Sequence, residues 1–219
     1  DRISGSVSSK TKIIFLTNPN NPTGTVFTAE EFDAFMGQIP SHVIVVVDEA
    51  YAEFSESAAF PDTIKYIKSK ANLIVLRTFS KFYGLAGLRC GYAIGKADLI
   101  APLFKAKMPF NVSRLAQAGA LAALGDRGFL AKTYKNNLEG KKLLYKEFDR
   151  LGLDYKKTEA NFIFVDIKKN ADAFCRDLLG LGVSIRPLTS FGLPEAIRIS
   201  IGTRQQNKKL VAAIKKALG

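Results

Sequence analysis

Three continuous apolar runs, each followed by polar residues, constrain the fold of this chain more than any other feature. They are KIIFLTNPN at 12–20, VIVVVDEAY at 43–51 and LIVLRTFSK at 73–81. A strand that is apolar at successive positions is typical of a parallel sheet covered on both faces. Helical patterns at 28–38 and 60–70 separate the runs, and the first has a Thr28 cap with Glu31 three residues later. The alternation predicts an α/β fold with a mostly parallel sheet, which also includes a fourth run at 90–96.

The pattern changes near residue 126. It then predicts a long amphipathic helix at 126–152, a strand at 160–167, a helix at 171–182, short strands at 183–187 and 196–202, and a closing helix. We therefore predict a large domain at 1–125 and a smaller α+β domain at 126–219, which begins with the long linking helix.

The composition excludes several classes of protein. Hydrophobic residues make up 47% of the 219 positions, which is enough for a substantial core. Cys90 and Cys175 form no CxxC motif and His42 is the only histidine, so we expect no disulfide framework, no metal site and little histidine-based catalysis. The apolar runs are too short to span a bilayer, and residues 1–10 lack an apolar signal core. We expect a cytoplasmic protein without a membrane partner.

The formal net charge of +12 raises the question of a nucleic-acid partner. Much of the excess lies in lysine doublets. In the closing stretch, four apolar residues recur at helical spacing, Leu210, Val211, Ile214 and Leu218, and this places the neighbouring lysines on the opposite face. No ribonucleoprotein, zinc-finger or basic-zipper pattern occurs. A solvated helix face is favoured over a polyanion site, and no nucleic acid is expected to bind.

Polar side chains converge where the predicted strands end. Parallel sheets bind ligands outside the carboxyl ends of their strands. The residues that follow the three runs are Asn21, Asp48, Tyr51, Thr78, Ser80 and Lys81, and Arg89 comes soon after. Each has an ordinary alternative: a strand-end cap for Asp48, a core aromatic for Tyr51, a solvated loop lysine for Lys81. Their joint occurrence at successive strand ends favours one site over coincidence.

An amine among a carboxylate, hydroxyls and a guanidinium suits one cofactor. Pyridoxal 5'-phosphate forms a Schiff base with a lysine and uses an acidic partner for its ring nitrogen. Lys81 and Asp48 would fill these two roles, and Tyr51 and Asn21 would hydrogen-bond the phenolic oxygen of the ring. Thr78, Ser80 and Arg89 would bind the phosphate.

The motifs NPNNPTG, VDEAY and TFSKFYGLAGLRCGY, with ANFIFV further on, resemble the fold type I pyridoxal-phosphate aminotransferases, and among these the histidinol-phosphate aminotransferase family. The resemblance implies a homodimer that moves an amino group from L-histidinol phosphate to 2-oxoglutarate, yielding imidazole acetol phosphate and L-glutamate. It implies catalytic roles for Lys81, Asp48 and Tyr51. It also places Asn161, Arg186 and Arg198 at the substrate.

Members of that family carry a substantial segment before NPNNPTG, whereas only a short lead precedes it in this sequence. We therefore expect a C-terminal portion of such an enzyme, with a partial large domain that lacks activity by itself. An aromatic or broad-range aminotransferase and a phospho-amino-acid decarboxylase would share the ring-binding residues. A ligand-sensing domain of a transcription regulator, or a fragment that is not catalytic, stays an alternative of a different class.

Overall fold

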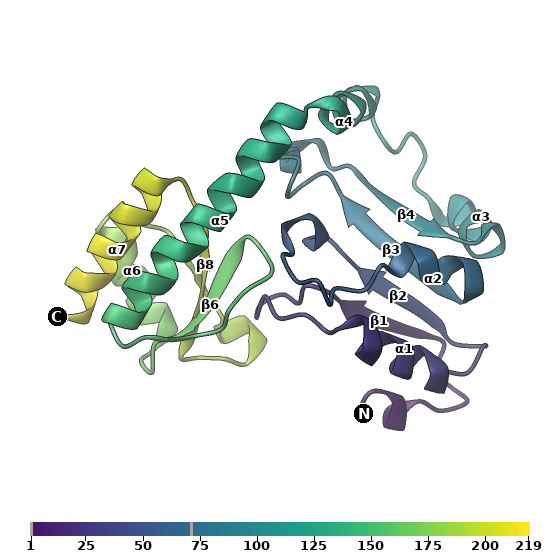
Figure 1. Ribbon diagram of the computed structural model, residues 1–219, viewed down its shortest axis with the longest axis horizontal. Coiled ribbons are helices and arrows are strands. Elements are labelled where there is room, and N and C mark those ends of the chain that lie inside the picture. The colour runs from purple at the N-terminus through teal and green to yellow at the C-terminus, as the bar shows by residue number, and fades with distance from the viewer. Residues whose placement is uncertain (1, 71) are drawn as a thin grey trace. The chain divides into compact units, whose positions relative to one another are not determined.

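The computed structural model describes residues 2–70 and 72–219, which form two compact units (Figure 1). The first unit comprises the chain up to Pro19 together with Val26–Arg127. The second comprises Gly128–Gly219 and, in addition, the loop Asn20–Thr25. The loop that follows the first strand therefore packs with the C-terminal part of the chain.

The first unit is built on a four-stranded sheet in the order β1-β2-β3-β4. Its strands β1 (Ile13–Thr17), β2 (Ile44–Asp48) and β3 (Leu73–Thr78) are parallel, and β4 (Gly91–Gly95) is antiparallel to β3. Helix α1 (Ala29–Gln38) follows β1, and helix α2 (Thr63–Ser69) follows β2. The mostly parallel sheet is confirmed.

Helices α1 and α2 cover one face of this sheet (Figure 1). The Thr28 hydroxyl accepts from Glu31 N, and the Glu31 carboxylate accepts from Thr28 N, so the predicted capping box is present. The core below the helices consists of Phe32, Phe35, Met36, Val45, Val47, Ile67, Leu73 and Val75. Strand β1 departs from the expectation of full coverage, because it is an edge strand among the described residues and exposes Ile13 (49%) and Phe15 (69%).

Two helices near the end of the first unit have no counterpart among the predicted elements. They are α3 (Ala97–Ala106) and α4 (Arg114–Gly125). Helix α4 buries only alanines, Ala116 and Ala120, while Leu115 and Leu121 are exposed at 78% and 74%. Their apolar surface is therefore largely uncovered by the described residues.

The second unit packs three helices on an antiparallel sheet (Figure 1). The helices are α5 (Arg127–Arg150), α6 (Ala171–Gly180) and α7 (Arg204–Leu218). The sheet has the order β5-β6-β8-β7, with β5 (Asp154–Tyr155), β6 (Phe162–Asp166), β7 (Arg186–Pro187) and β8 (Ala196–Ser200). Its core is apolar and includes Leu144, Phe148, Ile163, Val165, Leu178, Ile197, Ile199 and Ile214. The predicted smaller α+β arrangement is thus present.

The lysines of α7 lie on the face opposite its core residues, as the spacing predicts. Leu210, Val211 and Ile214 are buried, while Lys208, Lys209, Lys215 and Lys216 are exposed. One doublet differs, since Lys141 on α5 is only 4% exposed. Among the residues described, no helix combines the length and apolar character needed to cross a membrane.

Candidate active site

Five of the predicted residues line one cavity at the carboxyl ends of β2 and β3. The cavity has a volume of about 390 Å³, and Asp48, Thr78, Ser80, Lys81 and Arg89 are among its lining residues. The parallel register places Asp48 beside Leu76, so the end of β2 and the last residues of β3 share one edge. Of the seven side chains predicted to meet at the strand ends, these five line one cavity, whereas Asn21 and Tyr51 are not among its lining residues.

The polar groups of the cavity are held by local hydrogen bonds. Asp48 Oδ1 accepts from Ala50 N at 3.0 Å, which fixes the carboxylate just after the strand. The Thr78 hydroxyl donates to the carbonyl of Cys90 at 3.3 Å and accepts from Ser80 N at 3.0 Å. The residues of the loop after β3 are thereby ordered around one hydroxyl group.

Lys81 lies between two buried aromatic residues, Phe79 and Phe82. Phe82 packs edge-on against Phe54 with ring centroids 5.0 Å apart, so the backbone on either side of the lysine is anchored in the core. The lysine itself is exposed, and its Nζ lies 5.4 Å from the ring centroid of the buried Tyr51. Two of the predicted site residues, Lys81 and Tyr51, are therefore close in space.

Arg89 occupies an unusual backbone conformation. Its φ of 54° lies in the left-handed region, which few residues other than glycine adopt. Its Nη1 donates to the carbonyl of Ala86 at 2.7 Å, and the side chain is exposed at the cavity. The turn thus presents a guanidinium beside the hydroxyls of Thr78 and Ser80.

The remaining predicted residues lie in the second unit. Arg198 on β8 donates from Nη1 to Asn21 Oδ1 at 2.6 Å, and its guanidinium lies 4.9 Å from the ring centroid of Phe162. Arg186 is the register partner of Arg198 and is exposed. Asn161 is half-buried directly before β6, where its carbonyl accepts from Ile201 N at 2.9 Å. Asn21 is thus grouped with Arg198, and its contact with a cofactor ring stays a prediction.

The loop that carries Asn21 packs closely against the rest of the second unit at Gly24. Gly24 has a φ of +72°, and a Cβ there would lie 1.9 Å from the Thr158 hydroxyl oxygen. Its carbonyl also accepts from Glu159 N at 2.8 Å. Only glycine permits this approach of the loop to Thr158.

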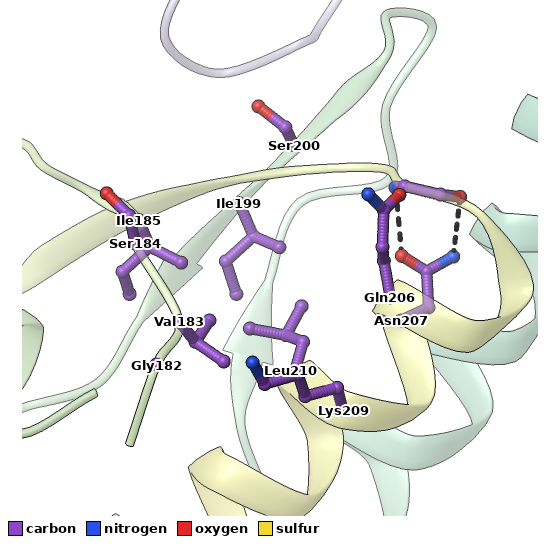
Figure 2. A pocket seen from close by; sticks show the side chains of 11 residues that line it. Gly182, Val183, Ser184, Ile185, Ile199, Ser200, Gln206, Asn207, Lys209 and Leu210 are labelled. Atoms are coloured by element: carbon purple, nitrogen blue, oxygen red, sulfur yellow. Dashed lines mark hydrogen bonds between the residues drawn. The ribbon is translucent and has the colours of Figure 1, made fainter. Parts of the chain in front are cut away.

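A second cavity contains none of the predicted residues. It has a volume of about 400 Å³ and lies in the second unit between β8 and α7 (Figure 2). The Asn207 side chain closes one end, since its amide exchanges two hydrogen bonds with the backbone of Gly202, at 2.9 and 3.0 Å. Lys209 is the one charged residue in the lining, so this cavity lacks the acid and amine pair of the first.

The donor set of the first cavity fits the cofactor that the sequence suggests. A carboxylate suits a protonated ring nitrogen, and an amine suits an aldehyde. Two hydroxyls and a guanidinium together suit a phosphate.

Comparisons with known proteins identify the family of this chain. The profile of the family described as "Aminotransferase class I and II" matches residues 2–214. The chain belongs to this family. The chain is 43% identical over 217 residues to the histidinol-phosphate aminotransferase of Moorella thermoacetica, covering 99% of this chain and 56% of that protein. It is 46% identical over 214 residues to histidinol-phosphate aminotransferase 2 of Pasteurella multocida, covering 97% of this chain and 58% of that protein.

A solved structure is similar as well. The crystal structure of histidinol-phosphate aminotransferase from Sinorhizobium meliloti in complex with pyridoxal-5'-phosphate superposes with a TM-score of 0.85 at 32% identity. The match covers 94% of this chain and 57% of that chain. The chain therefore spans less than two thirds of the length of these relatives, and it has the fold type I architecture over the part that it spans.

Proposed function

We propose that this chain is part of a cytoplasmic, homodimeric histidinol-phosphate aminotransferase that uses pyridoxal 5'-phosphate. The reaction transfers the amino group of L-histidinol phosphate to 2-oxoglutarate and yields L-glutamate. The observation that carries the proposal is the cavity in which Asp48, Thr78, Ser80, Lys81 and Arg89 meet. The names of the similar enzymes support the choice of substrate.

In this proposal the two units have separate tasks. Residues 1–125 form the part of the cofactor-binding large domain that this chain contains, and residues 126–219 form the small domain. The first cavity lies wholly in the former. Arg186, Arg198 and Asn161, which we assign to the substrate, lie in the latter.

Each residue of the cavity has a role in the proposed chemistry. Pyridoxal phosphate, when bound, supplies an aldehyde that bonds amines and a ring that withdraws electrons from them. The Lys81 amine would hold the cofactor through its aldehyde, and as a free amine it would take up and return the proton at the α-carbon of the substrate. Asp48 keeps a proton on the ring nitrogen. The Tyr51 hydroxyl and the Asn21 amide orient the phenolic oxygen, and Thr78, Ser80 and Arg89 hold the phosphate.

The test is a substrate panel on the complete gene product. We expect amino transfer from L-histidinol phosphate to 2-oxoglutarate to exceed transfer from phenylalanine or tyrosine. Release of CO₂ from a phosphorylated amino acid would instead indicate the decarboxylase alternative. Equal rates with phosphorylated and non-phosphorylated donors would favour a broad-range aminotransferase, and failure to bind pyridoxal phosphate would overturn the cofactor assignment.

A further inference from the structure

An ion pair between a fully buried glutamate and a half-buried arginine lies next to the first cavity. Glu49 is fully buried and shares its Oε2 with two donors of Arg77, Nε at 3.0 Å and Nη2 at 2.7 Å. Its other oxygen accepts from the hydroxyl of Thr63, the first residue of α2, which is also fully buried. Both carboxylate oxygens of Glu49 are therefore satisfied within the first unit.

The Glu49 and Arg77 side chains continue the face of the sheet that packs against α1, and Arg77 is also one of the residues that line the cavity. Side chains alternate between the two faces of a strand. Val45 and Val47 of β2 and Val75 of β3 pack in the core with α1, and Glu49 and Arg77 continue this face by the same alternation. Asp48 and Thr78 are one residue out of step with the pair and also line the cavity.

Each member of the pair is the sequence neighbour of a cavity residue. Glu49 follows Asp48 and Arg77 precedes Thr78. The backbone link between β2 and β3 at this end is the bond from Glu49 N to Leu76 O at 2.9 Å. The ion pair adds a side-chain connection at the same point, so it fixes the separation of the two strand ends.

We propose that Glu49 and Arg77 are positioning residues, whose ion pair holds Asp48 at the spacing from Thr78 and Lys81 that cofactor binding requires. This inference rests on the proposed function. A charge pair in a sheet core is weak support for stability, because apolar residues of similar volume often stabilise a fold as well or better. A role in holding the ends of β2 and β3 in place accounts for the position of the ion pair next to the cavity.

A second carboxylate decides which variant is informative. Glu53 follows on the short helix Ala52–Phe54, and its Oε1 is buried without a hydrogen-bond partner among the described residues. Loss of Arg77 would leave two buried carboxylates, Glu49 and Glu53, without a cation. Loss of the Glu49 charge leaves Arg77 with Glu53. Glu49→Gln is therefore the variant expected to fold.

The experiment compares Glu49→Gln with Val45→Ala in the complete gene product. Val45 is fully buried on the same face of β2 but lies away from the strand end, so it controls for lost stability. We expect the dissociation constant of pyridoxal phosphate to rise about tenfold in Glu49→Gln, and the visible circular dichroism of the bound cofactor to weaken. In Val45→Ala both should stay within about twofold of the parent protein, although its melting temperature falls.

Two further variants keep the proposal open to contradiction. Thr63→Val removes only the hydroxyl bond to Glu49 and should shift the same two readouts in the same direction by a smaller factor. Adding Arg77→Met to Glu49→Gln should raise the dissociation constant of pyridoxal phosphate little further, because the ion pair is already lost in the single variant. Unchanged affinity and dichroism in folded Glu49→Gln, or in Thr63→Val should Glu49→Gln not fold, would overturn the proposal. An equal loss in Val45→Ala would do the same. If the parent protein fails to bind pyridoxal phosphate, the proposed function itself is wrong.

Discussion

Arg198 donates a hydrogen bond of 2.6 Å to Asn21, a residue 177 positions earlier in the chain. The Nε of the same guanidinium is buried without a hydrogen-bond partner in the part of the chain that the structure describes. Buried guanidinium donors are costly to leave unpaired. Asn21 therefore orients a cation that still has capacity to bind an acidic group.

Asn21→Ala should weaken the binding of acidic substrates. Loss of the amide acceptor leaves Arg198 with a further unpaired donor, at a cost of about 1–3 kcal/mol. We expect KM for 2-oxoglutarate to rise about tenfold, with a smaller effect on cofactor affinity. Steady-state kinetics of the complete gene product measure this, with Thr25→Ala in the same loop as the control. A KM equal to that of the parent enzyme would show that Asn21 does not orient Arg198.

Arg186→Ala should discriminate between substrates. Arg186 and Arg198 are register partners on neighbouring strands, and paired guanidinium groups suit a phosphate. We expect kcat/KM for histidinol phosphate to fall about tenfold or more, and that for a non-phosphorylated aromatic amino acid to fall much less. Arg176→Ala on α6 provides a control, since Arg176 is an exposed arginine of the same unit outside the proposed site. Equal losses for the two substrates would argue against phosphate recognition by Arg186.

Asp48→Ala should slow turnover strongly. A buried ring cation that loses its carboxylate partner is destabilised by about 3–5 kcal/mol. If most of this cost falls on the transition state, kcat decreases by roughly two to four powers of ten. Asp62→Asn removes an exposed carboxylate at the start of α2 and should leave kcat near the parent value. Near-normal turnover by Asp48→Ala would mean that another acid holds the ring nitrogen.

Glu53→Gln should change how stability depends on pH. Burial raises the pKa of Glu53, and the charge of Glu49 adds to this, while the backbone N–H of Glu53 and Arg77 oppose it. The folded protein then holds this proton at pH values where the unfolded chain has lost it. The free energy of unfolding therefore falls as pH rises from the ordinary glutamate value through the raised one. Thermal melts across that range should show a smaller decline in Glu53→Gln than in the parent protein, and identical slopes would contradict the assignment.

The main elements of the fold were predictable because their signals are local. The apolar runs that became β1, β2 and β3, and the Thr28–Glu31 capping box, each depend on a few adjacent residues. Helices α3 and α4 were not predicted. In α3 the apolar residues Leu99, Ile100, Leu103 and Phe104 do recur at helical spacing, but Pro102 interrupts the pattern. In α4 only small alanines are buried and the leucines are exposed, so its pattern gives little indication of a core face.

The cavity was predictable for the same reason, but the side-chain contacts that hold its neighbouring residues in place were not. Asp48, Thr78 and Lys81 stand at strand ends, and topology alone brings strand ends together. The bond between Glu49 and Arg77 joins residues 28 positions apart, and that between Arg198 and Asn21 joins residues 177 positions apart. A charged residue directly next to each strand-end motif was the available signal for the first pair. The second pair depends on tertiary packing that no local pattern encodes.

The most direct measurement of the central claim is the identity of the lysine that bonds the cofactor. The complete gene product, loaded with pyridoxal phosphate, should be yellow, and borohydride should fix the cofactor irreversibly. Peptide mass spectrometry should then find the label on Lys81, whose amine lies beside Tyr51 at the cavity. Lys81→Ala should abolish the label, whereas Lys96→Ala, in a lysine outside the cavity lining, should not. Recovery of the label on a different lysine, or its persistence in Lys81→Ala, would contradict the account.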